Sequence, residues 1–122
     1  MSTDKPILKD FKKTISRLEE ALRLKKTDIV RDSAIKRFEL CFDLAWKNIQ
    51  LYARKEGIES HSPRNCLKTA FQLNLIKYDE SWLEMLEDRN LTVHMYKEKY
   101  ADEVFARLPK YLLLLKSLAQ NL

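Results

Sequence analysis

The scarcity of turn-forming residues is the feature that most restricts what this chain can fold into. One glycine and three prolines are spread over 122 residues. A sheet of many strands needs a turn every few residues, and those turns draw on glycine and proline. Long helices span the same length with far fewer turns. The sequence therefore favours an all-α fold.

Apolar residues recur with helical spacing in the first half of the chain. The first predicted helix covers residues 6–25, and its apolar stripe is Ile7, Phe11, Ile15, Leu18 and Leu22. The second covers residues 28–56, with Thr27 or Asp28 as its N-terminal cap and Gly57 as its left-handed C-terminal cap. Two apolar lines run along it, so we expect a central helix with neighbours on two sides. They are Val30, Ala34, Phe38, Cys41, Ala45 and Ile49, and Ile35, Phe42, Trp46 and Ala53.

Three further helices are predicted in the second half. Ser62 begins a short third helix, residues 63–73, and Asp79 caps a fourth. The third helix is expected to direct four residues inward: Leu67, Ala70, Phe71 and Leu73. Pro109 lies inside the last helix, residues 97–118, and predicts a kink or a break near residues 105–108. These elements favour one domain, residues 1–122, folded as an antiparallel, up-and-down four-helix bundle with an additional short helix.

Several classes of protein are disfavoured by the same sequence. The first residues lack the apolar core of a signal peptide, and the longest apolar run, Leu112–Leu115, is far too short to span a membrane. We therefore expect a cytoplasmic protein with free thiols at its two cysteines, and a core position for Cys41. His61 and His94 are isolated, and the acidic residues have no ligand spacing, so neither a metal nor another cofactor is expected.

Positive charge leaves two interpretations open. The formal net charge is +5, which permits a polyanionic partner, although a solvated helical surface of mixed charge explains it equally well. Arg64 and Lys68 lie one turn apart on the outer side of the third predicted helix. They are suited to holding a phosphate, and a solvated helix face is the alternative.

Residues 88–96 hold Arg89, Tyr96 and His94, which is one of only two histidines in the chain. Arg89 and His94 are separated by about 140° on an unbroken helix, so they converge only if the helix ends between them or a second chain completes the site. Arginine grips phosphate oxygens and histidine transfers protons near neutral pH. The pair suits RNA cleavage through the 2′-hydroxyl without a metal. A surface or hydrogen-bonded histidine, and a packed Tyr96, are the alternatives.

The order Arg89-Asn90, three residues, then His94-Met95-Tyr96 resembles the R-N-x-x-x-H-x-Y signature of HEPN proteins. The chain looks most like their subgroup called nucleotidyltransferase substrate-binding proteins, which is related to the HepT toxins of toxin–antitoxin pairs. The likeness extends over most of the chain and includes three further stretches. These are residues 37–47, the Ser62-Pro63-Arg64 tripeptide, and residues 82–90.

The resemblance implies a helical bundle that forms a homodimer, with the motifs of two chains facing each other. Arg89 and His94 would form a metal-independent endoribonuclease site, supported by Asp88, Asn90 and Arg64. A minimal nucleotidyltransferase encoded nearby would act as antitoxin by transferring AMP to Tyr96. The alternative is a non-catalytic subunit that docks such a nucleotidyltransferase and its substrate.

Overall fold

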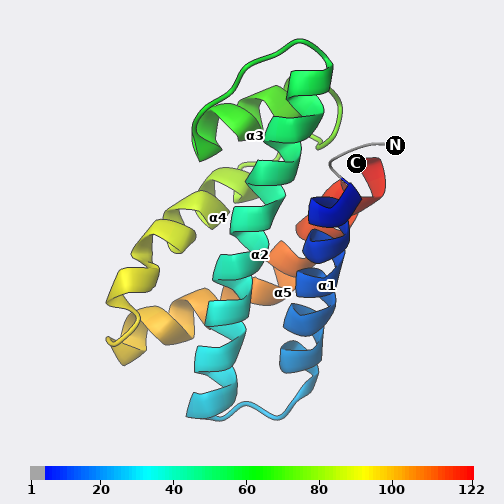
Figure 1. Ribbon diagram of the computed structural model, residues 1–122. Coiled ribbons are helices and arrows are strands. Elements are labelled where there is room, and N and C mark those ends of the chain that lie inside the picture. Colours follow the sequence, from blue (N-terminus) through cyan, green and yellow to red (C-terminus); the bar gives the residue numbers. More distant parts are fainter. Residues whose placement is uncertain (1–4) are drawn as a thin grey trace.

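The computed structural model describes residues 5–122, and all regular structure in that range is helical (Figure 1). A short 3₁₀-helix, η1 (Leu91–His94), separates the last two α-helices. The five α-helices are α1 (Lys5–Arg23), α2 (Asp28–Lys55), α3 (Pro63–Gln72), α4 (Ser81–Asn90) and α5 (Glu98–Asn121). The predicted all-helical bundle is confirmed, and α3 and α4 are its short members with 10 residues each.

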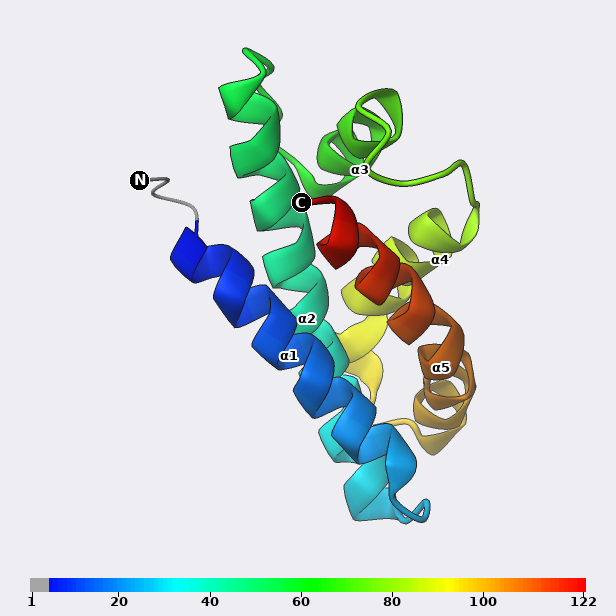
Figure 2. The same ribbon diagram turned by 90° about the vertical axis from the view of Figure 1, so that its right-hand side faces the viewer.

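Helix α2 is the centre of the bundle, as its two apolar lines predicted. It contacts each of the other four α-helices. Figure 1 shows α1 along one side of α2 and α3 and α4 on the other, while α5 packs against α1, α2 and α4 (Figure 2). Every residue of the two lines is buried except Val30 and Trp46, which are partly buried. The Phe38 ring stacks on Tyr111 of α5, with ring centroids 5.5 Å apart.

The polar and glycine residues at the helix ends act as predicted. The Val30 N–H donates to the Thr27 hydroxyl at 3.1 Å, and the Ser81 N–H donates to the Asp79 carboxylate at 2.8 Å. That second bond lowers the pKa of Asp79. Gly57 has a φ of 77°, and the Ile58 N–H donates to the carbonyl of Ala53 at 2.9 Å. These bonds satisfy backbone groups that a helix end leaves unpaired.

Replacing Gly57 with alanine is expected to lower the free energy of unfolding by about 1 kcal/mol, because a side chain disfavours a left-handed backbone. No heavy atom lies within 4 Å of the added Cβ, so a clash contributes nothing. Urea denaturation measures the loss. Gly57→Asn is the control and should lose less, since asparagine adopts this conformation more readily. Equal losses for the two variants would contradict the conformational explanation.

Two expectations about the second half need correction. Phe71 is 47% exposed, so the prediction that it points inward is wrong. Helix α3 buries Cys66, Leu67, Thr69 and Ala70, and Phe71 lies at the edge of that face, about 100° round the helix from Ala70. Of the kink or break predicted at Pro109, the break does not occur, because α5 continues through that residue. Leu108 and Tyr111, buried on either side of Pro109, hold both halves of the helix against the core.

Both cysteines are buried free thiols, and burial raises the pKa of Cys41 to about 12. This agrees with the predicted core position of Cys41. No helix within residues 5–122 combines the length and the apolar character required to cross a membrane.

Candidate functional site

The chain changes direction inside the stretch that the sequence singled out. Helix α4 ends at Asn90, η1 covers residues 91–94, and α5 begins at Glu98. The Thr92 hydroxyl donates to the carbonyl of Arg89 at 2.8 Å, which satisfies one carbonyl at the end of α4. The helix therefore ends between Arg89 and His94, and the 140° separation of an unbroken helix does not apply.

Arg89 is held by acidic residues of α2. Its Nε and Nη2 atoms donate to the two carboxylate oxygens of Asp43 at 2.9 and 3.0 Å, and Nη1 donates to the Thr92 hydroxyl at 3.1 Å. Glu39 lies 3.7 Å from Nη2. The hydrogen bonds to Asp43 raise the pKa of Arg89. The guanidinium is thus fixed in position and its charge is balanced within the protein.

His94 and Tyr96 lie on the exposed turn that follows. Tyr96 is 75% exposed, and the His94 ring meets its edge with centroids 6.3 Å apart. Within residues 5–122, neither side chain forms a hydrogen bond or an ion pair. Histidines that act as bases are commonly oriented by a second group, and no carboxylate in the described chain orients His94. The Tyr96 hydroxyl is open to approach by another molecule.

Asp88 points away from this turn, into the bundle. It is 3% exposed and accepts hydrogen bonds from Nε and Nη2 of Arg107, both at 2.8 Å, and from the buried Tyr111 hydroxyl. Burial raises the pKa of Tyr111, and the Asp88 hydrogen bond adds to this. The same carboxylate raises the pKa of Arg107. Asp88 therefore positions α4 on α5 and thereby holds the turn at residues 91–97.

The other predicted site residues separate into two places. Arg89 and Asn90 line a pocket of about 250 Å³ together with Asp43, Lys47 and other residues of α2. Arg64 instead lines a different pocket, of about 450 Å³, between α3 and α4. The structure thus brings Arg89 and Asn90 together, leaves His94 and Tyr96 on the adjacent surface, and places Arg64 elsewhere.

Sequence reasoning did not identify Asp43, Glu39, Arg107 or Tyr111 as partners of the motif. Asp43 and Glu39 are four residues apart, which places both on one face of α2, and that spacing was available as a signal. In the described part of the chain, no three histidine, cysteine or acidic side chains gather closely enough to hold a metal ion.

Comparisons with known proteins give one family match and several structural matches. A family model described as nucleotidyltransferase substrate binding protein like matches residues 7–122. No curated protein matches the chain. A crystal structure of a protein from Thermus thermophilus is 38% identical, with a TM-score of 0.83, and the match covers 88% of this chain and 94% of that one.

A second solved structure shares the fold. It is a Haemophilus influenzae protein described as revealing the fold of a substrate binding domain of a nucleotidyltransferase. The match has a TM-score of 0.83 and covers 93% of this chain and 97% of the other, at 20% identity. At that identity the likeness concerns the fold alone.

Proposed function

The chain belongs to the nucleotidyltransferase substrate-binding protein family, and on that basis we propose that it is a HepT-like HEPN protein whose Tyr96 accepts AMP from a partner nucleotidyltransferase. The observation that carries this proposal is the exposure of Tyr96, whose side chain is 75% accessible on the turn before α5. An acceptor tyrosine must enter the active site of another protein. A buried or hydrogen-bonded hydroxyl does not meet that requirement.

The chemistry of the transfer requires little from this chain beyond presentation of the hydroxyl. The phenolic oxygen of Tyr96 attacks the α-phosphorus of ATP, the bond to pyrophosphate breaks, and the phenolic proton passes to a base. Arg107 and Tyr111 of α5 donate hydrogen bonds to Asp88, and these contacts fix the end of α4 that leads into the turn. The chain therefore presents an exposed side chain on a fixed backbone, which reduces the entropy cost of docking.

The direct test is to incubate the purified protein with ATP and the nucleotidyltransferase encoded beside it. The intact mass of the chain is expected to increase by one AMP. The two proteins are also expected to co-elute from a sizing column before ATP is added. An unchanged mass with a demonstrably active partner would reject Tyr96 as an acceptor.

A second candidate function is metal-independent RNA cleavage by Arg89 and His94. It is supported by the end of α4 at Asn90, between Arg89 and His94, which is one of the two conditions under which these residues can converge. The arginine would steady charge on the phosphorane and the histidine would transfer protons. AMP on Tyr96 would then place an anion two residues from His94 and inhibit cleavage. This candidate ranks second because the Arg89 guanidinium already donates two hydrogen bonds to Asp43, and those donors are not free for a phosphate.

RNA cleavage is tested by incubating the protein with RNA beside a His94→Ala variant. Because His94 is exposed and forms no hydrogen bond in the described chain, the variant should fold as the wild type does. Cleavage by the wild type and its loss in the variant would support the second candidate. Equal cleavage by both proteins, or none by either at high concentration, would leave the AMP acceptor as the function of this site.

We also propose that two copies of the chain associate through η1. Leu91 and Val93 on this helix are 40% and 71% exposed, and Tyr96 lies three residues after Val93. Covering these apolar groups with a second copy removes them from water and brings two motif turns together.

Replacing Val93 with glutamate is therefore expected to convert a dimer into a monomer, because a charge enters an apolar contact. Light scattering at micromolar concentration measures the mass. Leu113→Glu is the matched control, since Leu113 is 67% exposed on α5 away from the motif turn. A wild-type protein that is already monomeric would refute the dimer.

A further inference from the structure

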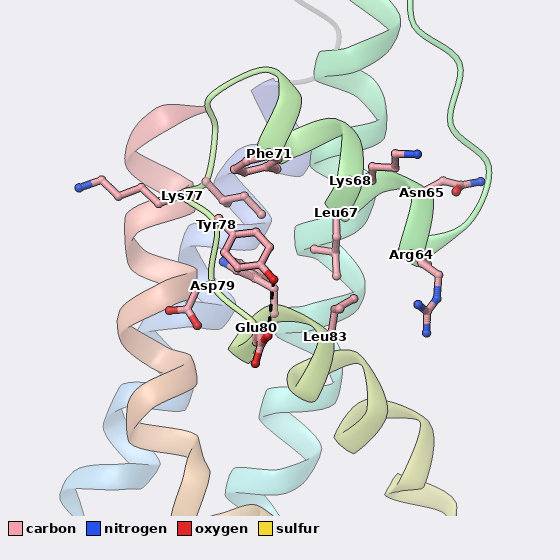
Figure 3. Close-up of a pocket in the computed structure, with 12 residues that line it drawn as sticks. Arg64, Asn65, Leu67, Lys68, Phe71, Lys77, Tyr78, Asp79, Glu80 and Leu83 are labelled. Atoms are coloured by element: carbon pink, nitrogen blue, oxygen red, sulfur yellow. Dashed lines mark hydrogen bonds between the residues drawn. The ribbon is translucent and has the colours of Figure 1, made fainter.

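The pocket between α3 and α4 has no part in the functions proposed above. Its volume is about 450 Å³, within the range that small ligands occupy. Its floor is apolar, and two aromatic rings, Phe71 and Tyr78, stand at its rim (Figure 3). The floor is formed by the buried Leu67 and Trp82 and the partly buried Ile76, and Leu83, which is 43% exposed, lies nearer the surface.

The two rim aromatics are unusually open for residues of their size. Phe71 is 47% exposed and Tyr78 is 74% exposed. Their rings meet edge to face, with centroids 5.8 Å apart, and that contact covers one face of only one of the two rings. Exposed aromatic faces beside an apolar floor favour a planar aromatic ligand, because stacking removes both surfaces from water.

Cations surround the same pocket. Arg64, Lys68 and Lys77 line it, and within residues 5–122 none of the three forms an ion pair or a side-chain hydrogen bond. Figure 3 shows Arg64 and Lys68 on the α3 side of the pocket, and Asp79 and Glu80 on the opposite side, near Tyr78. Lys77 lies on the same side as the two carboxylates, so the end formed by Arg64 and Lys68 carries the positive charge that no carboxylate of the pocket opposes.

We propose that this pocket binds a nucleotide, with the base stacked against Phe71 and Tyr78 and the phosphate held by Arg64 and Lys68. Arginine donates two parallel hydrogen bonds to phosphate oxygens, and base–aromatic stacking tolerates any base. The pocket shares no residue with 88–96, so the nucleotide proposal does not depend on whether Tyr96 accepts AMP.

The proposal is tested by titrating AMP into the isotope-labelled protein and following backbone amide shifts. We expect shifts confined to residues 63–90, with adenosine and inorganic phosphate each binding at least about tenfold more weakly than AMP, since each lacks one of the two contacts. A tetra-adenylate titration distinguishes the source of the ligand. Tighter binding of the oligonucleotide assigns the site to an RNA end, and equal binding assigns it to a free nucleotide.

Two exposed residues provide matched variants. Phe71→Ala should weaken AMP binding by about tenfold or more through lost stacking, and Arg64→Ala by about tenfold through the lost phosphate contact. Arg54→Ala removes an exposed cation outside the pocket and should bind as the wild type does. Circular dichroism melts confirm that each variant is folded.

Three results would overturn the nucleotide site. They are an absence of shifts at millimolar AMP, shifts outside residues 63–90, and wild-type affinity in both Phe71→Ala and Arg64→Ala. If AMP causes no shift while Phe71→Ala abolishes association with the nucleotidyltransferase, the pocket is a protein-docking surface instead.

Discussion

Asp88→Ala is expected to lower the free energy of unfolding by about 3 kcal/mol, the largest loss that we predict for a single side chain of this site. The substitution removes the acceptor of two Arg107 hydrogen bonds and leaves the hydroxyl of Tyr111 without its partner. Tyr111 is fully buried, so water does not replace the lost bond. Arg107 is 31% exposed and regains some hydration, which keeps the loss below that of a fully buried pair.

The control for Asp88 lies one turn earlier on the same helix. Glu84 pairs with Lys110 of α5 at 2.7 Å, but these side chains are 41% and 50% exposed. Glu84→Ala should therefore cost only about 0.5 kcal/mol. Urea denaturation of both variants compares the stability that the buried Asp88 hydrogen bonds contribute with the stability that the exposed Glu84–Lys110 ion pair contributes. Both sets of contacts join α4 to α5. Similar losses in the two variants would show that Asp88 does not hold α4 in place.

Tyr96→Phe is expected to abolish AMP transfer completely, because the phenolic oxygen is the atom that forms the new bond. The change removes one exposed hydroxyl that has no hydrogen-bond partner in the described chain, so stability should change by a few tenths of a kcal/mol. Intact mass after incubation with the nucleotidyltransferase and ATP is the measurement.

Tyr100→Phe is the control, since Tyr100 is 38% exposed near the motif turn and its hydroxyl, like that of Tyr96, has no hydrogen-bond partner in the described chain. Accessibility alone predicts labelling of both tyrosines, whereas recognition of the motif turn predicts labelling of Tyr96 only. Retention of the full mass gain in Tyr96→Phe would place the acceptor elsewhere and reject the proposed function.

The helix boundaries were predictable because local chemistry determines them. Thr27, Ser62 and Asp79 cap helices through their own side chains, and Gly57 adopts a backbone that other residues disfavour. Asn74 makes a second left-handed turn, with a φ of 61°, that sequence reasoning did not assign. Asparagine is a weaker signal than glycine for this conformation, which explains the omission.

The partners of the motif were not predictable in the same way. Arg89 meets Asp43 across 46 residues, and Asp88 meets Arg107 and Tyr111 across 19 and 23 residues. Hydrophobic periodicity shows which face of a helix is buried, but not which charged residue of another helix lies opposite. The same limitation misplaced Phe71, whose environment depends on Tyr78 beyond the end of α3. The sequence also grouped Arg64 with Arg89, but the packing of α3 places the two residues in different pockets.

Tyr96 is the proposed site at which a nucleotidyltransferase modifies this chain. Peptide mass mapping of the wild-type protein after reaction with the partner and ATP tests it directly. We predict one AMP per chain, carried by the peptide that contains Tyr96, with Tyr78 and Tyr100 unmodified. AMP on any other residue, or none on a chain that binds an active partner, would contradict the account.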